Sequence, residues 1–388
     1  MTVNLIPLSG CAGMSLSVLF GFCLFVLVTA LAIYARHYLR TGARHPEIFC
    51  DDAAPTRALI ERLPRLTSRY WPTPWLLNGH LQLFALILKK AIAPRLTYDR
   101  VDVLPMEDGG TTALHWLGWG LPADTPTLVV LHTITGSPHS MRDFMRDLRR
   151  LTGWRLVLCE RRGHGDLALT SPRFNTMGDV EDLRHQLQMI ESSVPDSPLY
   201  AAGVSAGTGL LVRYLGEAGV NTPLRGAFAY CPGYDISIAF QRCVPFYSRK
   251  MAQKLLQQFY HPNAQVFSHL ASAERFRSVS DLHDFHVHIA EFAGYADHAE
   301  YLARCNPVTV MQDVAVPLLI LNAEDDPVCA IENVRENQDA IRGIPGVILA
   351  VTARGSHCAH FSGWWAQPWA HALAAEYLLA VDEGRQGG

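Results

Sequence analysis

One serine lies in a pattern that could make it a nucleophile. Ser205 is the centre of Gly203-Val204-Ser205-Ala206-Gly207, and this motif directly follows an apolar run, residues 199–202. A serine hydroxyl reacts poorly unless a tight strand-to-helix turn exposes it beside a base. Glycines two residues before and two after the serine leave room for that turn. Residues 208–215 have helical apolar spacing, so the strand–turn–helix context is present.

Two downstream segments could supply the base and the carboxylate that orients it. A strand predicted at residues 317–322 leads into Asp325-Asp326-Pro327, and a strand predicted at residues 347–352 leads into Gly355-Ser356-His357. The order serine, aspartate, histidine, each after a strand, is typical of Ser-His-Asp acyl-transfer chemistry.

Each partner has a competitor nearby in the chain. Asp325 or Asp326 could be the acid; we favour Asp326, because the aliphatic residue that follows Pro327 would tuck under the next helix. Asp325 would then be a turn or helix-start residue. His357 or His360 could be the base; we favour His357, because Gly355-Ser356 provides a flexible approach. His360 is then expected to face a cap.

The tetrahedral intermediate of such chemistry needs two N–H donors aimed at its oxyanion. We expect one from the backbone of Ala206, at the start of the helix after the nucleophile. The other is expected from Ile134, in the loop His132-Thr133-Ile134-Thr135-Gly136 after a predicted strand. The alternative interpretation of this loop is an ordinary turn of small residues.

These residues need a scaffold that brings distant strand ends together. Short apolar strands alternate with amphipathic helices, which predicts an α/β fold with a mostly parallel central sheet and helices on both faces. In such a sheet the carboxyl ends of the strands meet at one edge. The helical, irregular stretch 235–300 interrupts the alternation and is the expected cap insert. Strands are predicted at residues 96–104, 111–116, 127–132, 155–160, 199–204, 225–230, 317–322 and 347–352, and helices at 140–151, 180–192, 330–341 and 365–381.

The N-terminal residues favour a membrane anchor. Residues 1–35 carry no charged side chain, and residues 14–35 form an apolar run of about 33 Å as a helix, enough to cross a bilayer. A signal peptide, the rival interpretation, usually has a basic start and a shorter apolar run. Arg36, Arg40 and Arg44 follow the span, so the positive-inside rule predicts a single-pass protein whose catalytic domain faces the cytoplasm. We expect an anchor at 1–40, a connecting segment at 41–95 packed on the domain, and a catalytic domain at 96–388.

Composition narrows the remaining possibilities. The 388 residues carry a net charge of −3 with mixed signs, which gives no argument for nucleic-acid binding. Nine cysteines without a Cys-x-x-Cys pair indicate free thiols rather than a disulfide framework. His283, His286 and His288 lack the further ligands that would complete a metal site. Residues 161–165, Arg-Arg-Gly-His-Gly, suggest a tight turn near the pocket rather than a phosphate loop. No cofactor or metal is expected.

The motifs together resemble those of the α/β-hydrolase superfamily. Within it, the chain resembles the membrane-anchored α/β-hydrolase-domain lipases and the bacterial YheT-type esterases from about Tyr70 to the C-terminus. This resemblance implies an α/β-hydrolase fold, an N-terminal anchor, Asp326 as the acid and His357 as the base. The matching residues are Trp71-Pro72, Gly79 to Gln82, Asp108 to Gly110, Trp116, Leu131-His132, Gly136, Arg162-Gly163, Gly203 to Gly207, Leu215 to Glu217, Gly294-Tyr295, Glu300-Tyr301, Pro317, Asp325 to Pro327 and His357.

The chain departs from the family pattern at a few positions. Thr133 replaces a glycine after the oxyanion-loop histidine, Ser356 replaces the second glycine of Gly-Gly-His, and Leu302 and Asn306 replace a tyrosine and a serine. A threonine restricts the backbone more than a glycine does, so this replacement is expected to affect the geometry of the oxyanion hole.

The sequence therefore predicts a serine esterase or lipase that cleaves lipid or short- to medium-chain fatty acyl esters through an acyl-enzyme. Two other functions remain open. An alcohol could replace water as the acyl acceptor, making the protein an acyltransferase. The protein could also be a lipid- or steroid-binding hydrolase relative with little activity.

Overall fold

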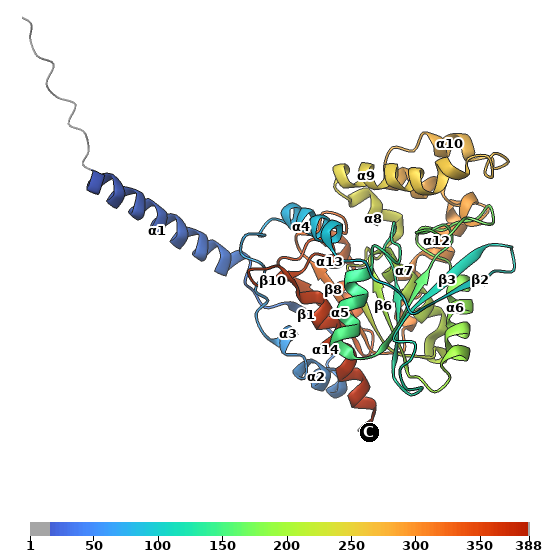
Figure 1. The fold of residues 1–388 in the computed structure, drawn as a ribbon, viewed down its shortest axis with the longest axis horizontal. Helices are drawn as coiled ribbons and strands as arrows, with labels where there is room; N and C mark the ends of the chain where they lie inside the picture. Colours follow the sequence, from blue (N-terminus) through green and yellow to red (C-terminus); the bar gives the residue numbers. More distant parts are fainter. Residues whose placement is uncertain (1–15, 387–388) are drawn as a thin grey trace, which may run out of the picture.

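The structure is a computed structural model that describes residues 16–386. Within these residues, nine strands form one sheet in the order β1-β9-β8-β7-β6-β4-β5-β3-β2 (Figure 1). The six strands from β9 to β5 run parallel, and β1, β3 and β2 pair antiparallel at the two edges. The predicted mostly parallel sheet is confirmed. The strands are β1 (Glu47–Phe49), β2 (Arg100–Pro105), β3 (Thr111–Leu117), β4 (Thr127–Leu131), β5 (Arg155–Glu160), β6 (Leu199–Val204), β7 (Leu224–Tyr230), β8 (Leu318–Ala323) and β9 (Val347–Thr352).

Helices cover both faces of this sheet, as predicted. Every residue of β4, β5, β6, β8 and β9 is buried, which explains why these strands are continuous apolar runs rather than alternating ones. Helices α6 (Val180–Ser193), α7 (Ala206–Ala218) and α13 (Ile331–Arg342) pack on one face. Helices α5 (Arg142–Thr152) and α14 (Trp369–Gln386) pack on the other.

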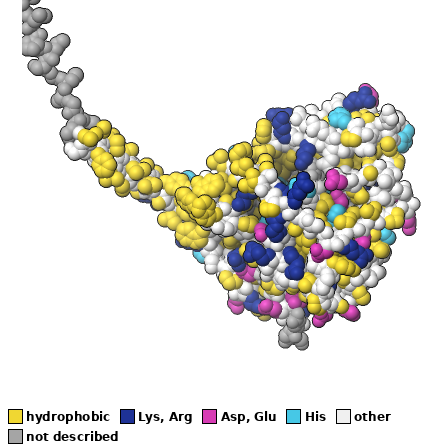
Figure 2. Space-filling view, viewed as in Figure 1, with side chains coloured by type: hydrophobic (Ala, Val, Ile, Leu, Met, Phe, Trp, Pro, Cys, Tyr) yellow, Lys and Arg dark blue, Asp and Glu magenta, His cyan; other side chains and the backbone are white. Residues whose placement is uncertain are grey.

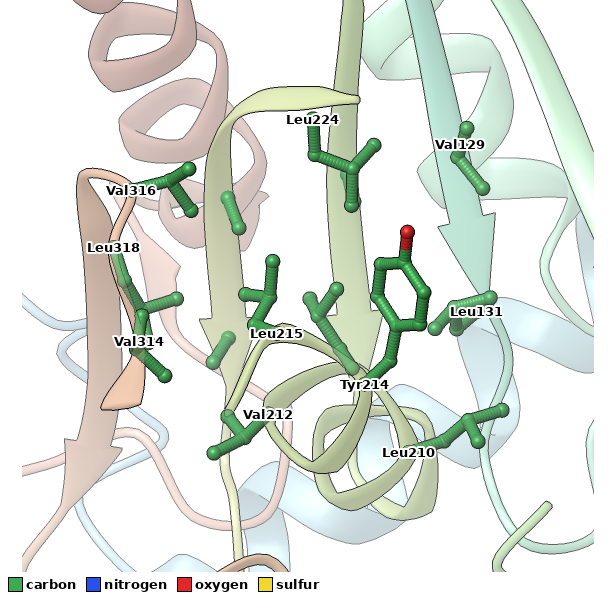
Figure 3. Packing of buried hydrophobic residues seen from close by; sticks show 14 of the residues in the cluster. Val129, Leu131, Leu210, Val212, Tyr214, Leu215, Leu224, Val314, Val316 and Leu318 are labelled. Atoms are coloured by element: carbon green, nitrogen blue, oxygen red, sulfur yellow. The ribbon is translucent and has the colours of Figure 1, made fainter. Parts of the chain in front are cut away.

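Helix α7 is the central support of the site. Its side chains, such as Leu210 and Leu215, lie in one buried cluster with strand residues such as Leu131 and Leu318 (Figure 3). The helix therefore holds its own N-terminus, where Ser205 lies, at a fixed place beyond the end of β6.

Several predicted boundaries were wrong at the edges of the fold. Strand β2 begins at Arg100 rather than residue 96. Helix α14 begins at Trp369 rather than residue 365, because a short hairpin of β10 (Phe361–Ser362) and β11 (Gln367–Pro368) precedes it. The edge strand β1 was missed, because its three half-buried residues are too few to show a pattern.

The segment 41–95 contains regular structure as well as connections. Besides β1 it holds α2 (Ala54–Glu61), α3 (Pro64–Thr67) and α4 (Gly79–Ile92). Leu63 and Leu66 are part of the core that α14 covers. The buried Tyr70 hydroxyl donates a hydrogen bond to the carbonyl of Phe361 at 2.7 Å. Parts of this segment therefore extend the sheet and its covering layer.

A helical insert joins β7 to β8 and lies beyond one end of the sheet, at the top of Figure 1. It contains α8 (Ile236–Arg242), α9 (Pro245–Leu255), α10 (Ala273–Arg277), α11 (Leu282–His288) and α12 (His298–Cys305). The insert has an aromatic core of its own, built around Phe259, Phe276 and Phe292. The helical part extends to Cys305, somewhat past the expected end at residue 300.

Helix α1 (Leu16–Thr41) projects from the domain (Figure 1). Its most apolar 18-residue stretch has a mean hydropathy of 2.7 and its 26 residues extend about 39 Å, so it is long and apolar enough to cross a membrane. It continues past the predicted end at residue 35, and the predicted start at residue 14 lies outside the described residues.

Candidate active site

Ser205 occupies a strained turn between β6 and α7. Its backbone has φ 53° and ψ −119°, a conformation that costs a non-glycine residue about 1–3 kcal/mol. The Ser205 N–H donates to the carbonyl of Tyr230 at 2.8 Å, which ties the turn to β7. A Cβ on Gly203 would lie 2.6 Å from the Gly207 carbonyl oxygen, and one on Gly207 would lie 2.3 Å from that of Leu131. The two flanking glycines are therefore required by close backbone contacts.

The structure brings Ser205, His357 and Asp326 into one hydrogen-bonded chain. His357 Nε2 lies 2.8 Å from Ser205 Oγ, and His357 Nδ1 lies 2.9 Å from Asp326 Oδ2. The other carboxylate oxygen, Oδ1, accepts the N–H groups of Val328 and Cys329 at 2.7 and 2.9 Å. With its second oxygen held by the backbone, the carboxylate can hold the imidazole with Nε2 toward the serine.

The surroundings of His357 favour its charged form. Burial lowers the pKa of the imidazole, but the Asp326 carboxylate, with smaller contributions from Cys358 and Cys329, outweighs burial and raises this pKa well above its usual value. An imidazole that gains a proton readily is suited to receive one from a serine hydroxyl.

The competing residues have structural partners instead. Asp325 Oδ1 accepts the N–H of Ser356 at 2.8 Å, so this carboxylate holds the loop that leads into His357. Burial raises the pKa of Asp325 to about 6. His360 lies between the Tyr230 hydroxyl at 3.2 Å and the Thr352 hydroxyl at 2.9 Å. Burial lowers its pKa to about 3, so His360 is a neutral core histidine. It does not face the cap, contrary to the expectation from sequence.

Ala206 and Ile134 lie beside Ser205 in the same pocket. Ala206 is the first residue of α7, where a backbone N–H has no partner within the helix. Thr133, the residue before Ile134, does not have the positive φ that would require a glycine. The departure from the family pattern at this position therefore introduces no strain of that kind.

Arg161 holds the loop that carries Ile134, a contact that sequence reasoning missed. Its guanidinium donates to the carbonyl oxygens of His132 at 2.9 Å and Thr133 at 2.7 Å. In a trans peptide the C=O and the next N–H point in opposite directions. Fixing the Thr133 carbonyl against Arg161 therefore turns the Ile134 N–H away from Arg161. The sequence predicted a tight turn near the pocket at residues 161–165, but it did not predict that Arg161 holds the loop of Ile134.

Two buried histidines complete the support of this loop. His164 Nε2 lies 3.1 Å from the Ile134 carbonyl oxygen, and His132 Nε2 accepts the Arg161 N–H at 3.2 Å. Burial and the Arg161 charge lower the pKa of His164 to about 3 and that of His132 well below its usual value. Both rings are therefore neutral hydrogen-bonding parts of the loop.

The pocket beside Ser205 is apolar. Its wall includes residues of the cap helices α8, α9 and α11, so the insert forms part of the enclosure. Among the described residues that line it, none is Asp, Glu, Lys or Arg. They are Ile134, Met177, Ser205, Ala206, Thr208, Gly209, Gly233, Tyr234, Ile236, Ala239, Phe240, Cys243, Met251, Leu282, Val328 and Cys329.

Groups of potential metal ligands in the described residues centre on His357. They are Cys231 with His357 and Cys358, and Asp326 with Cys329 and His357. Both need the imidazole whose nitrogens already face Ser205 and Asp326. A metal ion there would displace those hydrogen bonds. His286 is buried, with its Nδ1 2.7 Å from the Leu282 carbonyl, and stacks on Phe240, so it serves packing.

The sheet order, the strained serine turn and the cap define an α/β-hydrolase of the serine hydrolase class. A family profile described as "Serine aminopeptidase, S33" matches residues 124–361, and the chain belongs to this family.

Relatives along nearly the whole chain include lipases. "Embryogenesis-associated protein EMB8" of Picea glauca is 28% identical over 377 residues, covering 89% of this chain and 79% of its own length. "Phospholipase ABHD3" of Mus musculus is 28% identical over 377 residues, covering 91% and 86%. "Monoacylglycerol lipase ABHD2" of Danio rerio is 26% identical over 387 residues, covering 92% and 89%. The chain is thus similar to serine esterases and lipases, as the sequence motifs predicted.

Proposed function

We propose that this protein hydrolyses carboxylic esters of lipids or fatty acids with Ser205 as nucleophile, His357 as base and Asp326 as the residue that orients it. The observation that carries the proposal is the continuous chain from Asp326 Oδ2 through His357 to Ser205 Oγ beside an apolar pocket. A hydroxyl 2.8 Å from a carboxylate-oriented imidazole nitrogen is within proton-transfer distance.

The reaction proceeds in two halves. Ser205 Oγ attacks the ester carbonyl while His357 Nε2 takes its proton, and His357 then delivers that proton to the departing alkoxide. Water, activated by the same imidazole, hydrolyses the acyl-enzyme and releases the acid. Asp326 stabilises the imidazolium formed in each half.

The oxyanion of each tetrahedral intermediate would be held by the N–H groups of Ala206 and Ile134. The free N-terminal N–H of α7 and the Arg161-held peptide of Ile134 support this assignment. Such donors help most when they are fixed before the reaction, because no reorganisation is then needed in the transition state.

The pocket favours acyl chains over peptides. An aminopeptidase has to bind a protonated α-amino group, for which a carboxylate is the usual partner, and the described pocket lining contains none. Side chains such as Phe240, Met251 and Leu282 instead suit an alkyl chain. The phospholipase and monoacylglycerol lipase relatives support a lipid substrate.

Helix α1 would attach this enzyme to the membrane, with the catalytic domain on the cytoplasmic side. Its length and apolarity support a span, and Arg36, Arg40 and Arg44 near its C-terminal end support that orientation. The chain would then consist of an N-terminal anchor, a connecting segment packed on the domain, and a catalytic domain with a cap insert.

The test compares the wild type with Ser205→Ala on a short-chain p-nitrophenyl ester. We expect the variant to lose at least about 10³-fold in kcat, because no nucleophile remains. Ser192→Ala, an exposed helix serine, is the matched control and should retain full activity. A fluorophosphonate probe should label the wild type and Ser192→Ala but not Ser205→Ala. Equal rates in all three proteins would overturn the proposal.

Two further measurements separate the alternatives. Adding ethanol or glycerol distinguishes acyl transfer, which alone yields a new ester, from hydrolysis. A protein that binds lipid but is not labelled at Ser205 would be a binding relative with an inactive site. Cleavage of an amino-acid p-nitroanilide in preference to the ester would contradict the ester assignment.

A further inference from the structure

The outer face of α4 is apolar and uncovered. Leu81, Phe84, Ile87, Leu88 and Ile92 are between 51% and 74% exposed. Their spacing of three and four residues places them along one side of the helix. An apolar stripe of this length facing water is unusual in a soluble domain and marks a contact surface.

The inner face of the same helix is occupied by the domain. Gln82 is buried and donates to the Leu76 carbonyl at 2.7 Å, and Ala85 and Leu86 pack on a small cluster that includes Phe361. Lys89 lies over the Phe361 ring, 5.6 Å from its centroid. The inner face of α4 is therefore covered by the domain, and only its outer face is left without a protein contact.

The base of α1 contacts the segment that leads into α4. The Tyr38 hydroxyl of α1 donates to the Pro72 carbonyl at 2.7 Å, and the Tyr38 ring stacks on Trp71 with centroids 6.1 Å apart. Tyr34 donates to the carbonyl of Pro74. Residues 72–77 then lead straight into the Asn78 cap of α4. Figure 2 shows hydrophobic side chains continuing from α1 onto the adjoining part of the domain.

Exposed tryptophans lie in the two loops beside this junction. Trp71 and Trp75 are each 49% exposed, and Trp364 and Trp365 more so. Trp75 Nε1 donates to the carbonyl of Trp364 at 2.8 Å, which connects the two loops. Tryptophan is enriched where acyl chains meet headgroups, because its ring is apolar and its N–H is polar.

We propose that the outer face of α4 and the tryptophans around it form a second membrane contact, which lies in the interface of the same bilayer that α1 crosses. The occupant is a lipid surface because the patch is continuous with a membrane-spanning helix and carries interfacial aromatics. This inference rests on the proposed attachment through α1.

This contact would bring the cap to the membrane. His80, at the start of α4, stacks on Tyr247 of α9 and lies 2.7 Å from its hydroxyl. The neighbouring Phe246 is 58% exposed, which extends the apolar surface onto the cap. Met251 of the same helix α9 lines the pocket beside Ser205. A lipid leaving the bilayer next to α4 would therefore meet the same cap helix that lines the pocket beside Ser205.

The experiment uses the full chain reconstituted in phosphatidylcholine–phosphatidylglycerol vesicles that contain a lipid with a diazirine in its acyl chain. After illumination, peptides with cross-linked lipid are identified by mass spectrometry. We expect lipid on α1, on α4 and on the loop that contains Trp364. The control region is β2, whose Val101 and Val103 are exposed on the other side of the domain from α1 (Figure 1).

A variant tests the role of the apolar face. Phe84→Ser with Leu88→Ser should lower lipid labelling of α4 at least 5-fold and leave labelling of α1 unchanged. It should also lower kcat/KM for an ester embedded in vesicles several-fold, with no change for a soluble short-chain ester. Val101→Ser with Val103→Ser is the matched control and should change none of these values. Equal thermal melting of all proteins shows that each is folded.

The outcomes separate this inference from the proposed function. Lipid on α1 but not on α4 overturns the second contact alone. A dimer in detergent that Phe84→Ser with Leu88→Ser dissociates, with no lipid on α4, overturns it in favour of a second copy of the chain. Lipid on neither helix overturns the membrane attachment as well. Failure of ester hydrolysis with labelled α4 overturns the enzymatic proposal and leaves the contact intact.

Discussion

At the scale of single residues, the site depends on which atoms each side chain can reach. Asp325 and Asp326 are neighbours of identical chemistry, yet one accepts a backbone N–H from Ser356 and the other faces His357 Nδ1. Only the second can change the proton affinity of the imidazole directly. This difference makes the pH dependence of catalysis the most direct test of the assignment.

The first prediction concerns this pH dependence. Since Asp326 raises the pKa of His357 well above its usual 6.5, the imidazole is protonated below that raised pKa and cannot accept the Ser205 proton. Activity should therefore increase with pH through a midpoint above 6.5. Asp326→Asn should move this midpoint to lower pH and lower the plateau kcat by about 10⁴.

The control for this prediction is Asp325→Asn, which should keep the midpoint of the wild type. The measurement is kcat/KM for a soluble ester from pH 5 to 10. An unchanged midpoint in Asp326→Asn, or a larger shift in Asp325→Asn, would reverse the assignment of the acid.

The second prediction concerns Arg161 as a positioning residue. In Arg161→Met the Thr133 carbonyl loses its buried donor, so the Ile134 peptide is free to turn. We expect kcat to fall about 10- to 100-fold with little change in KM, because an oxyanion donor acts mainly in the transition state.

Arg161→Lys retains a donor and should recover part of the lost kcat, whereas Arg162→Met tests a neighbouring arginine that pairs with Asp108 and Asp182 instead. If Arg161→Met raised KM and left kcat unchanged, Arg161 would act on substrate binding rather than on the oxyanion loop.

At the scale of elements, the close approach of α7 to β4 sets the position of the nucleophile. Gly207 lies where these two elements meet, and no side chain fits between its Cα and the Leu131 carbonyl. The start of α7 can move away from the sheet only if the turn at Ser205, between β6 and α7, changes its backbone conformation.

The third prediction is that Gly207→Ala separates these elements. The added methyl group, 2.3 Å from the Leu131 oxygen, should lower the free energy of unfolding by about 2–3 kcal/mol and reduce kcat. Gly120→Ala, with nothing within 4 Å of the new Cβ, is the control and should change neither. Chemical denaturation measures the first effect; wild-type stability in Gly207→Ala would refute it.

At the scale of the whole molecule, α1 is part of the domain at one end and leaves it at the other. The Tyr38 hydroxyl donates a hydrogen bond to the Pro72 carbonyl, and Ala43, just after the helix, is fully buried. The predicted boundary at residue 40 therefore falls inside a packed region.

The fourth prediction follows from this packing. A chain lacking residues 1–33 keeps Tyr34 and Tyr38 and should retain the melting temperature and soluble-ester activity of the full protein. A chain lacking residues 1–42 should melt about 1–3 °C lower, because the hydrogen bond and ring contacts to residues 71–74 are lost, roughly 1–2 kcal/mol. Equal melting temperatures would place the boundary of the domain after residue 42.

Much of the central fold could be predicted because it depends on local patterns. Strands such as β5, β6 and β9 have their predicted bounds, since continuous apolar runs between turns are distinctive. Strand β1 could not be predicted, because its three residues become a strand only by pairing with β9. The hairpin before α14 was missed for the same reason.

The sequence by itself determined the order of the elements, the strand-to-helix turn around Ser205 and the apolar N-terminal helix. It also determined the few candidates for the nucleophile, the acid and the base. These follow from neighbours along the chain, where residue type and spacing act directly. The tertiary structure alone decided which aspartate faces His357, that His360 is a core residue, that Arg161 holds the Ile134 peptide and that α4 leaves an apolar face open. Each of those depends on contacts between segments far apart in the chain, and local residue patterns do not predict such contacts.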